Sequence, residues 1–129
     1  MRFMMFMMLP AGHRSEIGAL PDAEIVGEMG RFNQELIDAG ALIGLDGLQP
    51  TSKGARVSLA GGKPSVTDGP FTETNEIIGG YWMINADSRA KAIEWAKRVP
   101  GGEGVVEIRQ VFEMSDFPAD VQEAAQVSP

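Results

Sequence analysis

The strongest constraint on the fold is a run of consecutive apolar residues close to the start of the chain, Phe3–Leu9. The run is far shorter than the roughly 20 residues that a membrane-spanning helix needs. It also lacks the longer apolar stretch and small-residue cleavage site of a secretory signal. A short, uninterrupted apolar run is typical of a central strand that is buried on both faces. We therefore expect a central strand here, in a cytoplasmic protein with no membrane contact.

Two segments carry the spacing of apolar residues that predicts an amphipathic helix. The first covers residues 21–39 and ends at Gly40, which suits the left-handed conformation of a helix cap. Its apolar stripe consists of Ile25, Met29, Phe32 and Leu36. The second helix is expected over Arg89–Val99, with Asp87 or Ser88 as its N-cap and Pro100 as its end.

The remaining apolar segments predict strands that complete an α+β fold. They are expected at Ala41–Leu48, Ala55–Leu59, Ser65–Asp68, Ile77–Ala86 and Val105–Phe112. Ala55–Leu59 and Ser65–Asp68 form a hairpin around a glycine-rich turn. The order is then β-α-β, a hairpin insertion, and β-α-β, which is the split βαβ or ferredoxin-like arrangement. One domain covers residues 1–113, and a polar tail, 114–129, is expected to hold a short helix around Asp120–Gln126.

Alternation along the last two long strands predicts which side chains share a face. One face of the strand 77–86 holds Ile77, Gly79, Tyr81 and Met83, and the other holds Ile78, Gly80, Trp82 and Ile84. In the last strand Val106, Ile108 and Phe112 are expected on one face, with Glu107 and Arg109 on the other. Helices cover one side of such a sheet, so an apolar second side has to be covered by something else. The sequence therefore predicts a homodimer that buries the open face.

Composition excludes several classes of function. The chain has no cysteine, which excludes thiol nucleophiles, disulfides and thiolate metal sites. The net charge is −7, and the 11 basic residues are scattered among 18 acidic ones. Direct binding of nucleic acid is not expected, because most of its affinity comes from clustered basic groups. No phosphate-binding glycine loop, serine nucleophile elbow or zinc motif is found, so neither a cofactor nor a metal is predicted.

The segment Asp68-Gly69-Pro70-Phe71 and the strand that follows it resemble the DGPF-motif branch of the YCII-related family. Matching flanks lie at residues 39–50, 92–100 and 106–109, so the resemblance extends from residue 1 to about residue 113. It implies a ferredoxin-like protomer in a dimeric α+β barrel, with no established biochemical activity. Some relatives look like neighbours or fusion partners of extracytoplasmic-function sigma factors. More distant members carry a helix histidine paired with an aspartate; here that helix position holds Met29, and Asn75 replaces a common lysine.

Asp68 and His13 are the candidate catalytic residues. Asp68 precedes Gly69-Pro70, where a carboxylate most often caps a turn, and the alternative is a base or cation ligand at a cleft mouth. His13, the only histidine, follows the first strand and is either a solvated loop residue or a proton-transfer group. Antiparallel pairing of the first strand with 77–86 would bring the Pro10–Ser15 loop close to Asp68–Glu76.

Three further charged residues are candidate ligand-binding groups. Glu73 and Glu76 stand on the same stretch as Asp68, and together the carboxylates suit a hard cation, although solvated surface charge is the commoner use. Arg14 suits an anionic ligand. Two functions stay open: a small-molecule binder or enzyme with a cleft between sheet and helices, and a non-catalytic dimeric module that serves a regulatory partner.

Overall fold

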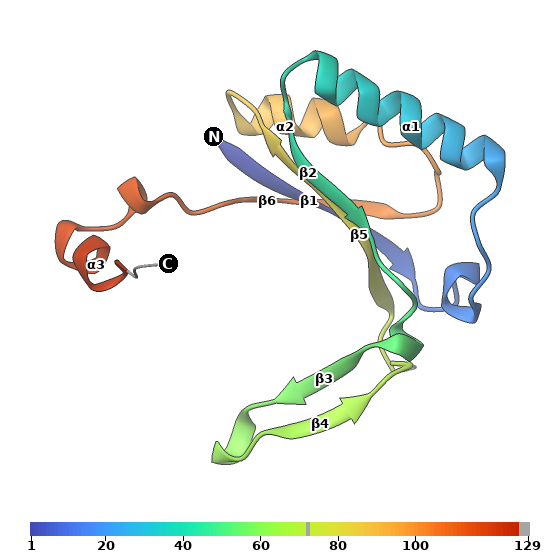
Figure 1. The fold of residues 1–129 in the computed structure, drawn as a ribbon, viewed down its shortest axis with the longest axis horizontal. Coiled ribbons are helices and arrows are strands. Elements are labelled where there is room, and N and C mark those ends of the chain that lie inside the picture. Colours follow the sequence, from blue (N-terminus) through green and yellow to red (C-terminus); the bar gives the residue numbers. More distant parts are fainter. Residues whose placement is uncertain (72, 127–129) are drawn as a thin grey trace.

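The chain folds around one four-stranded antiparallel sheet. The computed structural model describes residues 1–71 and 73–126. The sheet has the order β2-β5-β1-β6, formed by β1 (Arg2–Pro10), β2 (Leu42–Gly47), β5 (Glu76–Asn85) and β6 (Val105–Gln110). Helices α1 (Ala23–Asp38) and α2 (Arg89–Ala96) cover one face of it (Figure 1). This is the ferredoxin-like order, so the predicted fold class is confirmed.

The central strand is β1, as its apolar run predicted, and it pairs with β5 on one side and β6 on the other. Its burial is one-sided in the single chain. Phe3 and Met5 are buried against the helices, whereas Met4, Phe6 and Met8 are only half-buried on the opposite face. The expectation of burial on both faces is therefore wrong for the isolated protomer, because both helices pack on the same side.

The core between sheet and helices is aromatic at its centre. The core residues are Phe3, Met5, Phe32, Leu36, Ala41, Trp82, Ile84 and Ala92. The ring of Phe32 meets Trp82 edge-on at 5.6 Å between centroids and Trp95 at 6.3 Å. The indole N–H of Trp82 donates to Oδ1 of Asn33 at 2.9 Å, so its one polar group is satisfied although the residue is buried. Each fully buried side chain of this size contributes roughly 1.5–3 kcal/mol.

Local capping sets the helix boundaries. Asp22 accepts a hydrogen bond from the backbone N–H of Ile25 at 2.9 Å, so α1 begins at Ala23 and Pro21 lies before the cap. Gly40 has a φ of 68° and ends the helix as predicted. Helix α2 begins after Ser88 as predicted but stops at Ala96, short of Val99. Beyond Ala96 the last turn tightens, because the N–H groups of Arg98 and Val99 bond the carbonyls of Trp95 and Ala96, three residues back.

A bulge in β5 changes which side chains share a face. Met7 pairs with Gly80 and Met8 with Ile78, which leaves Gly79 without a partner. A Cβ at Gly79 would lie 2.5 Å from Cδ1 of Leu9, so glycine fits the bulge. The alternation predicted for Ile77 and Ile78 is wrong for this reason. Ile77 pairs with Leu9 and is buried, whereas Ile78 pairs with Met8 on the open face and is 44% exposed.

The last strand is also shorter than predicted. Strand β6 ends at Gln110, where its pairing with β1 ends at Phe3. Phe112 therefore does not share the buried face of Val106 and Ile108. It is 73% exposed and contacts Phe117 at 5.0 Å between ring centroids. The chain then leaves the sheet as an arm that carries the short helix α3 (Ala119–Ala124).

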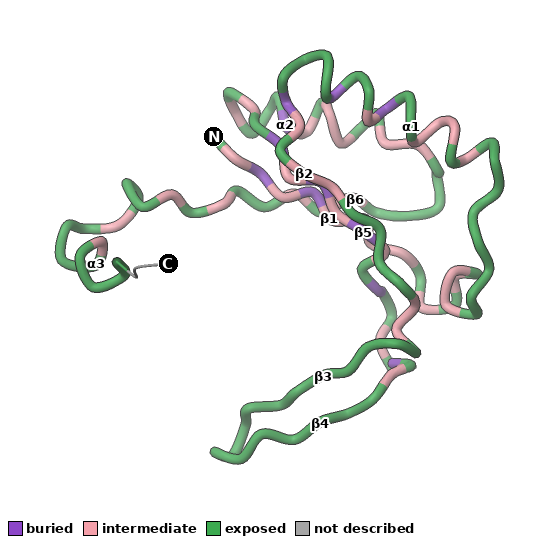
Figure 2. The backbone as a smooth tube through the Cα atoms, in the orientation of Figure 1, coloured by how far each residue is buried: buried purple, intermediate pink, exposed green. Residues whose placement is uncertain are grey.

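The hairpin of β3 (Ala55–Ser58) and β4 (Ser65–Asp68) forms a separate two-stranded sheet. It projects away from the main sheet, and every residue of its two strands is exposed (Figure 2). At its base, a Cβ on Gly69 would lie 1.7 Å from the carbonyl oxygen of Thr51. Only glycine allows this close approach. No helix in the part of the chain described is both long and apolar enough to cross a membrane.

Candidate functional site

A cavity of about 450 Å³ lies between the sheet and the N-terminal half of α1. Its size is within the range of small-molecule sites. The apolar part of its wall includes Met7 and Leu9 of β1, Ile25 and Met29 of α1, and Leu48. The polar part includes His13, Arg14, Ser15 and Glu103. The cavity is thus apolar along most of its length, with polar groups gathered on one wall.

His13 sits on that polar wall because β1 ends at Pro10 and a single-turn 3₁₀ helix begins at Arg14. Its side chain is only 17% exposed. Nδ1 of the ring lies 2.8 Å from Oγ of Ser15 and accepts the backbone N–H of Ser15 at 3.2 Å. Nε2 lies 3.0 Å from the carboxylate of Glu103. Both ring nitrogens therefore have a partner, and the imidazole is fixed in place.

The hydrogen bonds determine where the neutral ring carries its proton. A backbone N–H can only donate, so Nδ1 of His13 must be the acceptor. The proton then belongs to Nε2, which donates it to Glu103. An imidazole with one nitrogen acting as an acceptor and the other bound to a carboxylate is the arrangement of a general base.

Glu103 reaches His13 from a glycine-rich loop that precedes β6. Gly101 and Gly102 have φ values of 116° and 64°, which side chains other than glycine rarely adopt. A Cβ on Gly104 would lie 2.6 Å from the carbonyl oxygen of Met8. These glycines let the loop lie against the end of β1. Glu103 was not predicted from the sequence. The pairing of Met8 with Val105 could have indicated Glu103, because it brings the residues just before β6 to the end of β1.

The predicted site residues separate into two groups. His13 and Arg14 line the cavity. Asp68 ends β4 opposite Ala55, and Glu73 and Glu76 are exposed; none of these three is on the described cavity wall. The predicted closeness of the two loops is confirmed, because the N–H of Ala11 donates to the carbonyl of Asn75 at 3.1 Å. The carboxylate that contacts His13 is that of Glu103, at 3.0 Å.

A polar link joins the 3₁₀ helix to the base of the hairpin. The carboxylate of Glu16 accepts the backbone N–H of Thr51 at 2.8 Å and also the Thr51 hydroxyl. The Thr51 hydroxyl oxygen in turn accepts the N–H of Phe71 at 3.3 Å. Phe71 is buried, and the guanidinium carbon of Arg56 lies over its ring, 4.0 Å from the ring centroid. Thr51 and Phe71 thus link the base of the hairpin to the 3₁₀ helix that begins at Arg14.

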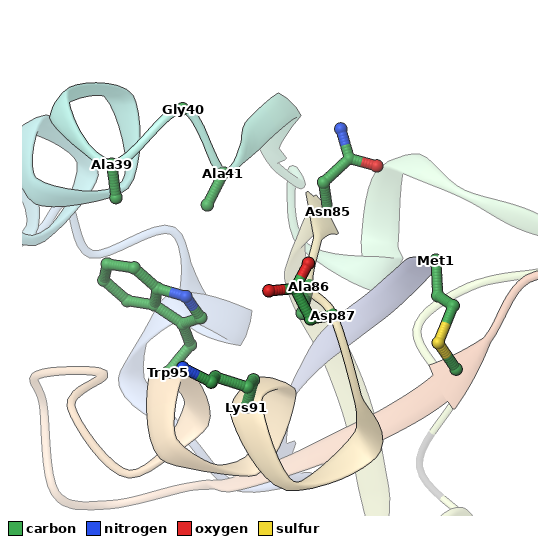
Figure 3. Close-up of a pocket in the computed structure, with 9 residues that line it drawn as sticks. All are labelled: Met1, Ala39, Gly40, Ala41, Asn85, Ala86, Asp87, Lys91 and Trp95. Carbon is green, nitrogen blue, oxygen red and sulfur yellow. The ribbon is translucent and has the colours of Figure 1, made fainter.

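A second hollow, of about 400 Å³, lies at the opposite end of β1 (Figure 3). Its lining includes Lys91 and Trp95 of α2, Asn85 at the end of β5 and Asp87 just after it, with Met1 also labelled at the rim (Figure 3). Its lining side chains include one carboxylate, from Asp87, and one lysine, Lys91, but no histidine and no hydroxyl. The hydrogen-bonded imidazole makes the His13 cavity the stronger candidate. Over residues 1–71 and 73–126 no cluster of three or more metal-ligating side chains occurs.

Two hydrogen-bonded pairs outside the cavity shift the pKa of their members. The hydroxyl of Tyr81 donates to Asp46 at 2.7 Å on the open face, and this bond raises the pKa of Tyr81 above 10.0. Arg2 donates twice to Glu113, at 2.6 and 3.0 Å, which lowers the pKa of Glu113 below 4.5 and raises that of Arg2. The second pair joins the start of β1 to the C-terminal arm.

Comparison with known proteins identifies a family but no activity. The sequence model of the YCII-related domain matches residues 1–115. A protein of Rhizobium meliloti (strain 1021), described as uncharacterized, is 29% identical over 76 residues, which cover 59% of this chain and 61% of that protein. The aligned region is thus less than two thirds of the relative's length. Because the domain model covers nearly the whole chain, from the first strand to the end of the sheet, the chain belongs to the YCII-related family.

Proposed function

We propose that this YCII-related chain is a dimeric binder or enzyme for a small molecule, and that the molecule binds in the cavity at His13. The observation that carries the proposal is the hydrogen-bonded imidazole of His13 on the wall of an otherwise apolar cavity. Sites for small molecules combine mostly apolar walls with a few polar groups that fix orientation. The cavity between sheet and α1 has this composition.

The lining predicts the kind of ligand. Met7, Ile25 and Met29 would contact an apolar body, while His13, Ser15 and Arg14 would meet one polar end group. Met29 occupies the helix position at which more distant YCII-type members are expected to carry a histidine. In this chain His13 would supply the imidazole from the loop after β1 instead. The motif at Asp68–Phe71 supports assignment to the DGPF-motif branch of the family.

Binding of small probes by calorimetry tests the proposal. We expect at least one of phenylacetate, octanoate and benzylacetone to bind with a Kd of about 1 mM or tighter. Met29→Trp should weaken this binding strongly because the larger ring takes up part of the apolar space in the cavity. Met114→Trp, on the arm, is the matched control and should leave it unchanged. Equal binding by both variants would contradict the assignment of the ligand to this cavity.

A role for Asp68 stays a prediction, and one variant tests it. Asp68→Asn keeps the size of the side chain and removes its charge. If the hairpin carboxylate takes part in the site, the variant loses ligand binding and keeps its fold. If Asp68 only stabilises the turn, the variant loses roughly 1 kcal/mol of stability and binds as before.

The dimer is the second part of the proposal. The open face of the sheet presents apolar side chains on neighbouring strands, including Phe6 beside Tyr81 and Met4 beside Met83. Apolar patches of this kind on one face are rarely left bare. A second copy that presents the same face would cover it with matching side chains. The cavity lies on the helix side of the sheet and would stay accessible.

The alternative function is a non-catalytic module that serves a regulatory partner in the cytoplasm, such as a sigma-factor system. The hairpin favours it, because Val57, Leu59 and Val66 are 56–75% exposed. A two-stranded hairpin of this length is marginally stable alone in water. A partner that bound the hairpin would protect these side chains, and binding of small probes in the His13 cavity would then be absent.

A further inference from the structure

We propose that Ser15 is a nucleophile for acyl transfer, with His13 as its general base and Glu103 as the carboxylate that holds the imidazole. The inference rests on the proposed function, because the substrate has to enter the His13 cavity. The substrate class is an ester of a small apolar acid. His13 and Ser15 stand at the start of the 3₁₀ helix after β1, Glu103 stands in the loop before β6, and all three line the cavity.

The direction of the hydrogen bonds supports this assignment. Nδ1 of His13 is an acceptor because the backbone N–H of Ser15 donates to it. Oγ of Ser15 lies 2.8 Å from the same nitrogen, so on the neutral ring its O–H shares the one lone pair of Nδ1 with the backbone N–H. Nε2 carries the other proton and donates to Glu103 at 3.0 Å. A hydroxyl that donates to an imidazole oriented by a carboxylate is the geometry of an activated nucleophile.

The reaction needs no group beyond water. As Oγ of Ser15 attacks the carbonyl carbon, its proton passes to Nδ1 of His13, and a C–O bond forms. The ester C–O bond then breaks, and the alcohol leaves with the proton from the imidazolium. Water attacks the acyl-serine, gives a proton to Nδ1, and releases the carboxylic acid while the proton returns to Oγ. Glu103 stays ionised and stabilises the imidazolium in both steps.

The other lining groups suit the same chemistry. Arg14 is the one Lys or Arg side chain on the described cavity wall, and a cation is one of the groups that stabilise a developing oxyanion. Met7, Leu9 and Met29 line the space for the acyl chain. The capping bond to His13 comes from the backbone N–H of Ser15, so Ser15→Ala removes the hydroxyl and keeps the cap.

Covalent labelling of the full chain by an alkyl fluorophosphonate, read by intact mass and peptide mapping, tests the inference. We expect one phosphonyl group per chain, on Ser15, together with hydrolysis of p-nitrophenyl butyrate. Ser15→Ala should abolish labelling and hydrolysis, whereas Ser65→Ala on exposed β4 should change neither. His13→Gln should slow labelling by at least about 100-fold, and Glu103→Gln should slow it as well.

Binding of benzylacetone, a ketone that cannot be hydrolysed, separates the two proposals. Ser15→Ala should still bind it, because the apolar wall is intact. If the wild type binds the ketone but Ser15 is not labelled, the proposal that Ser15 is a nucleophile is wrong, while the proposed ligand site in the His13 cavity is retained. Failure of every probe to bind would overturn both. Labelling at another serine, or labelling of Ser15 at an equal rate in His13→Gln, would also overturn the inference.

Discussion

At the scale of single residues, glycines decide where backbone segments can meet. Gly69 lets the base of the hairpin contact Thr51, and Gly104 lets the loop before β6 press against Met8. Gly30 in α1 has no neighbouring atom within 4 Å of the place where a Cβ would stand, so it serves no packing purpose among the described residues. Glycine is therefore required at the first two positions and costs stability at the third.

Two alanine substitutions test this contrast. Gly69→Ala should lower the free energy of unfolding by about 2 kcal/mol or more, because backbone atoms of Thr51 must move away from the new methyl group. Gly30→Ala should raise it by about 1 kcal/mol through helix propensity. Urea denaturation measures both. Equal effects of the two substitutions would show that the close contact at Thr51 does not matter.

At the residue scale the sequence singled out His13 and Arg14, which line the cavity, but not Glu103, whose carboxylate contacts the imidazole. The strand pairing was sufficient to bring the residues 10–15 loop beside the start of β5. It could not show that the glycine-rich loop before β6 turns its one carboxylate toward the same imidazole. That orientation depends on the positive φ values of Gly101 and Gly102, which spacing in a sequence does not reveal.

At the scale of elements, strand and helix order was predictable and boundaries were less so. The hairpin strand Ser65–Asp68 was predicted to the residue. The bulge at Gly79 was not, because a single unpaired residue leaves the apolar pattern of the strand almost unchanged. The end of β6 at Gln110 was missed for a related reason: Phe112 continues the alternation but has no partner residue on β1.

The C-terminal arm should separate from β1 in acid. The contact between Arg2 and Glu113 lowers the pKa of Glu113, so it is present above the ordinary carboxyl pKa and is lost as the pH falls through the lowered value. The methyl resonance of Met114, next in the chain, should shift below pH 4.5. Glu113→Gln should produce the same shift at neutral pH. Glu107→Gln is the control, since the carboxylate of Glu107 lies 3.7 Å from Arg109 and not from Arg2. An unchanged Met114 signal in Glu113→Gln at neutral pH would contradict the contact between Arg2 and Glu113.

At the scale of the whole molecule, the one-sided burial of β1 predicts self-association. Sedimentation at micromolar concentration should give twice the chain mass of 13.8 kDa. Phe6→Asp, on the open face, should give a monomer, because a charge in the covered face would be desolvated. Val26→Asp is the control, since Val26 is 54% exposed on α1 and should leave the mass unchanged. A wild-type monomer would contradict the proposed dimer.

Fold and site therefore differ in how much the sequence reveals. The ferredoxin-like order follows from apolar periodicity, which the whole length of each element supports. The cavity depends on a few contacts between loops, and a sequence pattern holds no record of these. NMR signals can distinguish binding in the cavity from binding on the open face, because His13 is the only histidine of the chain and methionines lie on both faces of the sheet.

The most direct test of the central claim, that a small molecule binds at His13, is a titration of the methionine-methyl-labelled chain followed by NMR. With benzylacetone as the probe, the His13 ring signals and the methyl signals of Met7 and Met29 should shift together. The methyl signals of Met4 and Met83, on the open face, should stay in place. Shifts confined to Met4 and Met83, with His13 unchanged, would contradict the account and assign binding to the open face of the sheet.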